Sequence, residues 1–259
     1  MTSNEIFQVD RARVQIDTTK ADSGEAAGTA AARLIRSAIA GKGAARIIVA
    51  TGNSQLETVA TLTRAPDIAW SRVTVFHMDE YAGMSATHPA SFRRWVKERL
   101  VDLVHPGQVH YLTGDASDLD EECRRYGELL LEAPVDLCLL GIGENGHIAF
   151  NDPHVADFND PRAVKRVSLD VRCRMQQVGE GHFASFELVP LEALTLTIPT
   201  LMRPEHLVCS VPEKRKAEAV RNALEGPLTP SCPGSIVRTH SNAQIFLDAE
   251  SASLLSRHS

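Results

Sequence analysis

The sequence predicts an α/β protein: a doubly wound, mostly parallel β-sheet with helices on both faces, as in a modified Rossmann-like fold. Short apolar runs alternate with helix-like segments along the 259 residues, which is the order of repeated β–α units. The strand-like runs lack polar alternation, which is typical of parallel strands covered on both faces. Because no linker, low-complexity tract or repeat divides the chain, we expect residues 1–259 to form a single domain.

The first β–α unit is the most regular. Over residues 22–39, Ala, Leu and Ile recur at spacings of three and four, which predicts a helix with one buried face that ends at the following glycines. Residues 46–50 (Arg-Ile-Ile-Val-Ala) are β-branched and apolar, so we expect a buried strand. A helix over residues 54–62 follows, with Ser54 as its N-cap and Glu57 completing a capping box.

The same alternation continues to the C-terminus. Further strands are expected at residues 73–77, 109–112, 135–140, 193–198, 207–211 and 244–247. Further helices are expected at residues 90–103, 119–131 and 213–224. We expect a polar turn at residues 79–89 and a polar, proline-containing section without assigned elements at residues 151–181.

Composition limits the partners and the compartment. With 27 basic and 33 acidic side chains, the net charge of −6 argues against a nucleic-acid or anionic-membrane surface. Five cysteines without a C-x-x-C pair suggest neither a disulfide framework nor a zinc site. No signal-peptide core or membrane-spanning apolar stretch is found, so we expect a cytoplasmic protein.

In a parallel sheet, ligands bind beyond the carboxyl ends of the strands, and three turns there attract attention. The first is the small-residue turn made of Thr51, Gly52, Asn53 and Ser54. Its backbone N–H groups and the following helix N-terminus could hold an anion, most naturally a phosphate. The alternative is an ordinary capped turn between a strand and a helix.

The second turn carries two adjacent carboxylates, Asp79 and Glu80, at the end of a strand. A partly buried Asp beside a like charge has its pKa moved toward neutrality, which suits a general base. The alternative is a solvated acidic turn.

The third turn contains Gly-x-Gly-x-x-Gly at residues 141–146, directly after a strand. We do not interpret it as a dinucleotide site, because that motif requires a helix and Pro153 follows too closely. His147, with Asp152 five residues later, fits a proton-transferring His oriented by an acid. The alternative is a His that satisfies backbone groups in a tight turn.

Other chemistries have little support in the sequence. The remaining histidines lack metal-ligand spacing, and no motif marks a nucleophile, so we expect neither a metal nor a cofactor. The basic group Lys214–Lys216 is either a solvated face or the source of a cation that closes over a bound phosphate.

Together these segments resemble the glucosamine-6-phosphate deaminase (isomerase) family, within the group that also holds the 6-phosphogluconolactonases. Met-Asp-Glu-Tyr at residues 78–81 and Gly-x-Gly-x-Asn-Gly-His-Ile-Ala-Phe-Asn at residues 141–151 carry the resemblance. It implies a metal-independent conversion of glucosamine 6-phosphate and water into fructose 6-phosphate and ammonia. It also implies a phosphosugar as the partner and, only at the level of the family, a homo-oligomer.

The resemblance implies a role for each motif residue. Asp79 is the base that moves a proton between C2 and C1, and His147 transfers the proton in opening the sugar ring, positioned by Asn145 and Asp152. The groups that hold the phosphate are Thr51, Gly52, Asn53, Ser54, Gln177 and Lys216.

Three positions depart from the family pattern: Asp152 replaces a Glu, Gln177 lies where a phosphate-binding Arg is expected, and Gln55 replaces a Pro. The allosteric residues are only partly matched, so we predict no allosteric activation. Two alternatives therefore stay open: a sugar-lactone hydrolase like 6-phosphogluconolactonase, and a non-catalytic sugar-phosphate-binding homologue.

Overall fold

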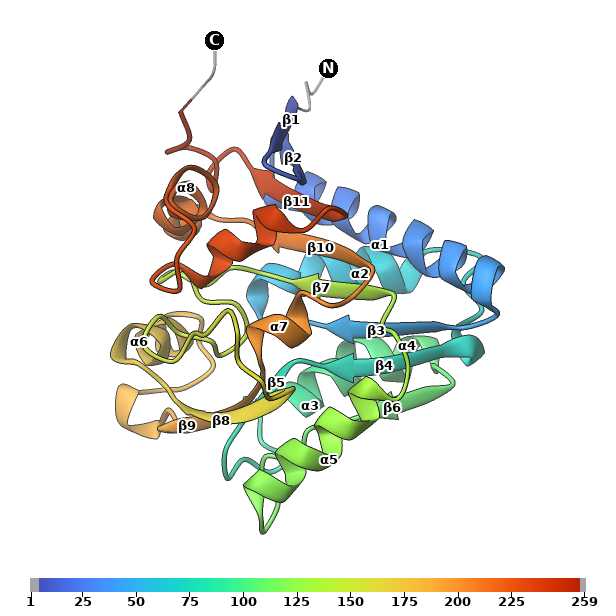
Figure 1. Ribbon diagram of the computed structural model, residues 1–259, viewed down its shortest axis with the longest axis vertical. Coiled ribbons are helices and arrows are strands. Elements are labelled where there is room, and N and C mark those ends of the chain that lie inside the picture. The colour runs from blue at the N-terminus through green and yellow to red at the C-terminus, as the bar shows by residue number, and fades with distance from the viewer. Residues whose placement is uncertain (1–4, 257–259) are drawn as a thin grey trace.

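The computed structural model describes residues 5–256 and has a central eight-stranded sheet in the order β1-β2-β11-β10-β7-β3-β4-β6 (Figure 1). Its neighbouring strands are parallel except for the antiparallel pair β1–β2. This confirms the predicted mostly parallel sheet. The strands are β1 (Glu5–Val9), β2 (Ala12–Asp17), β3 (Ala45–Val49), β4 (Val73–His77), β6 (Gln108–His110), β7 (Leu137–Leu140), β10 (His206–Val211) and β11 (Ala243–Asp248).

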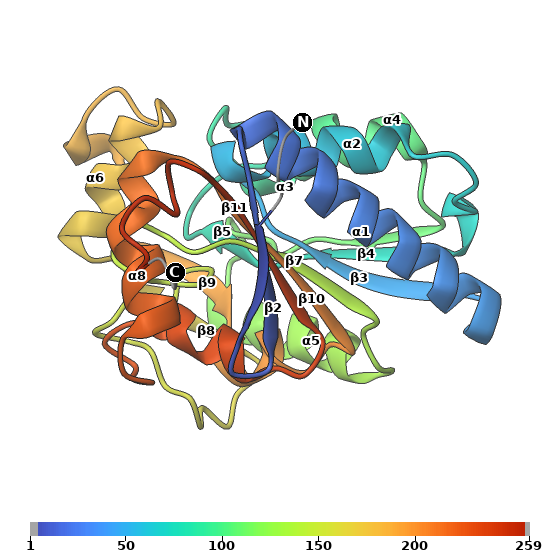
Figure 2. The same ribbon diagram turned by 90° about the horizontal axis from the view of Figure 1, so that it is seen from above.

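Helices cover both faces of this sheet (Figure 2). Buried residues of α1, α2 and the α3 region pack on one face, and those of α5, α7 and α8 pack on the other. The helices are α1 (Lys20–Lys42), α2 (Leu56–Arg64), α3 (Phe92–Val96), α4 (Asp102–Val104), α5 (Leu119–Leu131), α6 (Val171–Gly179), α7 (Ile198–Leu201) and α8 (Ala217–Glu225). Within the described residues, no helix is long and apolar enough to cross a bilayer.

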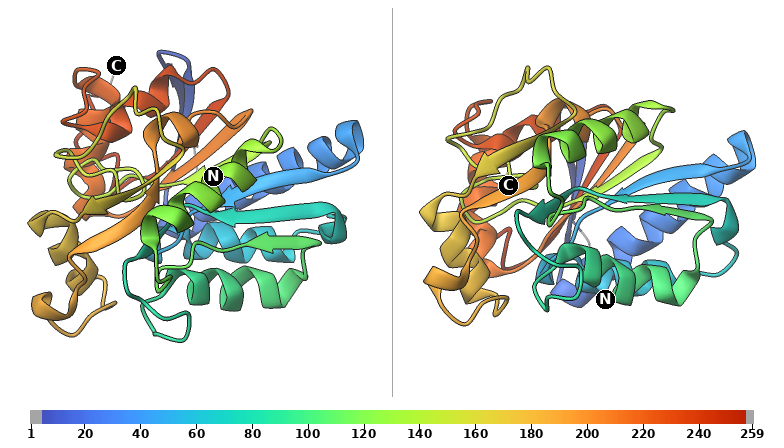
Figure 3. Two further views of the ribbon diagram at one scale, coloured as in Figure 1. Left: turned by 60° about the horizontal axis from the view of Figure 1, so that its bottom comes forward. Right: turned by 90° about the horizontal axis from the view of Figure 1, so that it is seen from below.

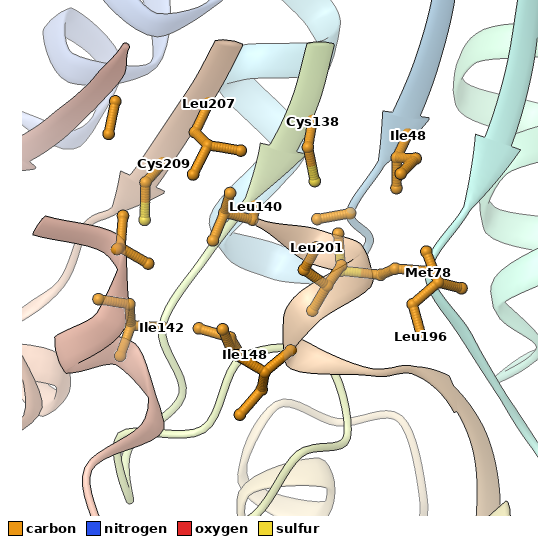
Figure 4. Packing of buried hydrophobic residues seen from close by; sticks show 14 of the residues in the cluster. Ile48, Met78, Cys138, Leu140, Ile142, Ile148, Leu196, Leu201, Leu207 and Cys209 are labelled. Atoms are coloured by element: carbon orange, nitrogen blue, oxygen red, sulfur yellow. The ribbon is translucent and has the colours of Figure 1, made fainter. Parts of the chain in front are cut away.

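The central strands are buried on both faces, as their sequences predict. In β3, Ile48 faces the α5 side while Ile47 and Val49 face the α1 side. Figure 4 shows Ile48 beside Cys138 of β7 in the cluster on the α5 side. Side chains that alternate between two apolar layers explain why these runs contain almost no polar residues.

A second, antiparallel sheet in the order β5-β9-β8 lies beside α5 (Figure 3). Its strands are β5 (Asp79–Tyr81), β9 (Glu192–Leu196) and β8 (Val164–Ser168). The prediction that residue 79 begins a polar turn was therefore wrong. Strand β5 pairs with β9, and all three of its side chains are buried. The strand predicted near β9 is present, but it belongs to this sheet rather than to the parallel one.

Several element ends differ from the predicted ones. Helix α1 is longer than expected because Thr19 forms a capping box with Asp22, and it ends where Gly43 adopts φ 82°. The predicted capping box of Ser54 and Glu57 is wrong. A 3₁₀ turn, η1 (Asn53–Gln55), precedes α2, so Ser54 already lies inside helical backbone.

Besides β5 and the short helix α7, four further elements have no counterpart in the prediction. Strands β1 and β2 form a hairpin at the edge of the sheet, and β8 and α6 lie in the section expected to be irregular. All four carry exposed polar positions, so their apolar periodicity is weak.

Candidate active site

A cleft opens at the carboxyl ends of β3, β4 and β7, where the three segments that the sequence marks as functional meet. Seven residues predicted for the site line it: Thr51, Gly52, Ser54, Asp79, His147, Gln177 and Lys216. The other three predicted residues do not line the cleft but contact residues that do. Asn145 and Asp152 contact His147, and Asn53 donates a hydrogen bond to the Glu180 carbonyl oxygen (3.1 Å).

The turn after β3 has the backbone of an anion site. Gly52 adopts φ 91° and ψ 177°, a conformation that side chains disfavour. No side-chain hydrogen bond caps η1 or α2 within the described part of the chain. The backbone N–H groups at the start of η1 and α2 therefore lie beside the cleft, and no side-chain hydroxyl of the described residues occupies them.

Asp79 and Glu80 face opposite sides of β5, because successive residues of a strand alternate. Only Asp79 lines the cleft. Glu80 is fully buried and accepts hydrogen bonds from the backbone N–H groups of Tyr81 (2.9 Å), Phe92 (3.2 Å) and Arg93 (3.0 Å). It also accepts one from the Ser91 hydroxyl (2.7 Å), so Glu80 has a structural role at the start of α3.

The Asp79 carboxyl favours its protonated form more than an exposed Asp does. Burial, and then the neighbouring charge of Glu80, raise the pKa of Asp79 well above its ordinary value. Among the described residues, no hydrogen-bond donor contacts its Oδ1 atom. A desolvated carboxylate without hydrogen-bond donors is a stronger base than a carboxylate in water. Removal of a proton from carbon requires such a base.

His147 is held by two polar neighbours. Its Nδ1 lies 3.1 Å from Asp152 Oδ1, and its backbone N–H donates to Asn145 Oδ1 (3.1 Å). The Asn145 amide in turn donates to Asp152 and to Asp170, both at 3.0 Å. These contacts hold the imidazole at Nδ1, and His147 also lines the cleft.

Asp152 is ionised in this arrangement. Burial by itself raises its pKa, but the contact with His147, then the hydrogen bonds from Asn145 and the Asp170 backbone, hold the pKa below its ordinary value. The shorter Asp side chain therefore reaches the imidazole in this fold, although the family pattern has a Glu here.

Positive charge at the anion end of the cleft comes from one buried lysine. Lys216 lies in the 3₁₀ turn η5 (Lys214–Lys216), and burial lowers its pKa. Gln177 also lines the cleft, and its Oε1 accepts a hydrogen bond from the Tyr81 hydroxyl (2.6 Å). The neighbouring Arg174 is turned away, because its guanidinium donates to the carbonyl oxygens of Phe186 and Val189.

Sequence reasoning missed Glu180 and His182, which line the same cleft. Both follow α6, a helix that the sequence pattern did not predict. The only local signal is a glycine on each side of Glu180, at the end of a short polar helix.

One cluster near the cleft has the residue types of a metal site. Potential ligand atoms of His147, Asp152 and Cys173 lie within 4.8 Å of one another. Burial, and then the charges of Asp152 and Asp170, raise the pKa of the Cys173 thiol well above its ordinary value. Without a metal the thiol keeps its proton, and a protonated thiol is a weaker ligand than a thiolate.

Comparisons with known proteins show the family to which the chain is related. A family model described as glucosamine-6-phosphate isomerases/6-phosphogluconolactonase matches residues 18–246. A glucosamine-6-phosphate deaminase of Exiguobacterium sibiricum is 38% identical over 208 residues, which cover 80% of each chain. One of Bacillus thuringiensis is 36% identical over 208 residues, covering 80% of this chain and 77% of the other.

Solved structures resemble the fold over most of the chain. A monomeric glucosamine-6-phosphate deaminase superposes with a TM-score of 0.84 at 32% identity, covering 93% of this chain and 99% of the other. A 6-phosphogluconolactonase from Shewanella baltica superposes with a TM-score of 0.74 at 18% identity, covering 93% and 97%. The second likeness is one of fold only.

Proposed function

Because this chain belongs to the glucosamine-6-phosphate isomerase/6-phosphogluconolactonase family, we propose that it is a glucosamine-6-phosphate deaminase. The reaction converts glucosamine 6-phosphate and water into fructose 6-phosphate and ammonia. The observation that carries the proposal is that Asp79, His147 and the turn after β3 line one cleft together with Lys216. A base, a separate proton-transferring group and an anion site are what this isomerisation requires.

His147 acts first, on the closed sugar ring. It takes the proton of the C1 hydroxyl and returns a proton to the ring oxygen as the bond between that oxygen and C1 breaks. The product is the open-chain aldehyde. Asp152 and Asn145 hold the imidazole for this transfer, through the 3.1 Å contact at Nδ1 and the hydrogen bond to the His147 backbone.

Asp79 then moves a proton between two carbons. Its carboxylate takes the proton from C2 while the C1 carbonyl oxygen gains the proton that the C2 ammonium gives up. This forms an enediol-type intermediate that carries nitrogen at C2. The carboxylate then delivers its proton to C1. The imine left at C2 is hydrolysed by water, which releases ammonia and forms the ketose. A carboxylate with a raised pKa holds the proton between the two steps better than an ordinary Asp does.

The phosphate is held at the turn after β3. Backbone N–H groups at the start of α2, the hydroxyls of Thr51 and Ser54, and the Lys216 ammonium supply the donors. Gln177 supplies an amide in place of a guanidinium, so the site has less positive charge than the family pattern implies.

The experiment measures ammonia and fructose 6-phosphate formed from glucosamine 6-phosphate. We expect Asp79→Asn and His147→Gln to lower kcat by about 10²- to 10⁴-fold with a smaller effect on KM. Matched controls are Asp120→Asn, at an exposed position of α5, and His206→Gln, at the opposite end of β10 from the cleft. Full activity in both Asp79→Asn and His147→Gln contradicts the mechanism.

The same samples decide between this reaction and the two alternatives. Hydrolysis of 6-phosphogluconolactone faster than deamination identifies a lactonase instead. Tight binding of glucosamine 6-phosphate without turnover identifies a non-catalytic homologue. Asp79 favours the deaminase, because lactone hydrolysis has no proton to move between carbons.

We also propose that the chain acts as one domain in the cytoplasm. The N-terminal strand β2 pairs with the C-terminal strand β11 in one sheet, and all five cysteines are buried and unpaired. The homo-oligomer expected from the family stays a prediction, and the 32%-identical deaminase is described as monomeric. Sedimentation velocity tests this prediction by comparing the mass of the protein in solution with the 28.2 kDa mass of one chain.

A further inference from the structure

A carboxylate lies at the anion end of the cleft, where a phosphate site ordinarily has only donors. Glu180 lines the cleft together with Gly52 and Lys216, and its side chain is only 7% exposed. Its Oε2 lies 3.7 Å from the place where a β-carbon on Gly52 would be. The carboxylate therefore faces the same turn that we assign to the phosphate.

Charged and polar groups surround Glu180 from two elements. From η5, Arg215 Nη1 lies 3.1 Å and Lys216 Nζ lies 4.0 Å from Glu180 Oε1. From α6 and the residues after it, Gln176 donates a hydrogen bond (2.8 Å), and His182 Nε2 lies 3.3 Å from Oε2. Two further carboxylates, Glu144 and Glu213, share Arg215 with Glu180.

These neighbours keep Glu180 ionised. Burial opposes ionisation, but the contact with His182 and the charges of Lys216 and Arg215 hold the pKa of Glu180 at about 2. An ionised carboxylate is a hydrogen-bond acceptor and not a donor. It repels a phosphate ester with two negative charges, whose terminal oxygens are all acceptors.

A phosphate ester that keeps one proton is different. Its P–OH group can donate to a carboxylate while its other oxygens accept from Lys216 and the backbone of the turn. We propose that Glu180 is a specificity-determining residue that makes this end of the cleft select the singly protonated phosphate ester. The inference rests on the proposed function only in placing the phosphate at this end of the cleft.

Selection of the protonated ester makes phosphosugar binding depend on pH. The second pKa of a phosphate ester is about 6, so the protonated form disappears between about pH 5 and pH 7. Affinity for a phosphosugar therefore falls as pH rises through this range. The test therefore needs a second ligand whose own charge does not change over this range, so that changes in the protein act on both ligands.

Sorbitol 6-phosphate and sorbitol 6-sulfate form the matched pair of probes. Neither has a carbonyl or an amine, so neither can be turned over by the proposed reaction. At pH 5.5 both carry about one negative charge, but only the phosphate has a proton to donate. The ratio of their affinities isolates the hydrogen bond to Glu180, because any titration of the protein acts on both ligands.

Isothermal titration calorimetry at pH 5.5 and pH 8 measures this ratio. We expect the wild-type protein to bind the phosphate at least about tenfold more tightly than the sulfate at pH 5.5, and to lose most of that preference at pH 8. In Glu180→Gln the preference at pH 5.5 disappears, because the amide can donate to either ester. Glu144→Gln, which removes another carboxylate 3.1 Å from Arg215 but does not line the cleft, keeps the wild-type ratio.

A wild-type ratio that is the same at both pH values overturns the proposal, as does a Glu180→Gln variant that keeps the preference. Absence of binding of both probes also overturns it. If Glu180→Gln does not fold, the affinity ratios of the wild-type protein at pH 5.5 and pH 8 still test the proposal. The deaminase assay is separate: selective phosphate binding without ammonia release contradicts the proposed function and leaves the assignment of Glu180 intact.

Discussion

At the scale of single residues, Asp79 and Glu80 show how neighbours of the same type acquire different roles. Both carboxyls are buried in β5, and strand alternation points one into the cleft and the other under α3. Glu80 receives four donors from the following segment, whereas Asp79 Oδ1 receives none from the described residues. The contrast predicts opposite effects of their removal on stability.

Removing the Asp79 charge should stabilise the protein while it lowers activity. The folded protein holds the Asp79 proton to a higher pH than the unfolded chain does, so stability falls as pH rises from about 4 toward the raised pKa of Asp79. Asp79→Asn removes this loss. We expect its free energy of unfolding at pH 8 to exceed that of the wild type by about 1 kcal/mol or more, and to match it near pH 4.

Urea unfolding at the two pH values measures the difference. Asp120→Asn, at an exposed position, should leave the free energy of unfolding unchanged at both. A less stable Asp79→Asn variant at pH 8 shows that the native carboxylate has stabilising partners after all.

At the scale of elements, the short strand β5 was the hardest to predict. Its three residues carry two carboxylates, and the pattern of polar residues favoured a turn. Pairing with β9 overrides that preference, since the antiparallel partner satisfies the β5 backbone groups inside the protein. Elements with regular apolar periodicity, such as β4 and α5, were predicted with their correct bounds.

Glu80 joins two elements, so its loss should destabilise both. It supplies the acceptor for the backbone N–H groups of Phe92 and Arg93 at the start of α3. We expect Glu80→Ala to lower the free energy of unfolding by about 3 kcal/mol, because buried donors lose their charged acceptor.

Chemical denaturation measures this effect. Glu98→Ala is the control, because the exposed pair of Glu98 with Arg94 contributes little and should change stability by less than about 0.5 kcal/mol. Equal losses in the two variants contradict the assigned role of Glu80.

At the scale of the whole molecule, one buried histidine links the sheet to a helix. His77 ends β4, and its Nε2 accepts a hydrogen bond from the Leu112 backbone (2.8 Å). Its backbone N–H donates to the Tyr126 hydroxyl of α5 (2.9 Å), and that hydroxyl donates to the His77 carbonyl (2.8 Å). The sequence contains this histidine, but only packing shows that it is structural.

His77 should make the fold sensitive to acid. Burial, and then the charge of Arg93, lower the pKa of His77 to about 3. Below about pH 6.5 the unfolded chain therefore binds a proton that the folded chain does not. The free energy of unfolding consequently decreases as the pH is lowered. We expect a loss of about 1.4 kcal/mol per pH unit between pH 6 and pH 4 from this residue.

Unfolding by urea across that range measures the slope, and His77→Gln should reduce it. His206→Gln, at the partly exposed start of β10, should keep the wild-type slope. An unchanged slope in His77→Gln assigns the acid sensitivity to other groups.

The sequence by itself determined the parallel sheet, most of its helices, and the three segments at strand ends that carry Asp79, His147 and the small residues after β3. Those features are local: apolar periodicity and turn chemistry are properties of short segments. Only the tertiary structure decided that the turns share one cleft and that Glu80 faces away from it. Only the tertiary structure placed Glu180 beside Lys216, because this pair joins the residue after α6 to η5 across 36 positions of the chain. Contacts between distant segments depend on how the layers pack, and no pattern within one segment records them.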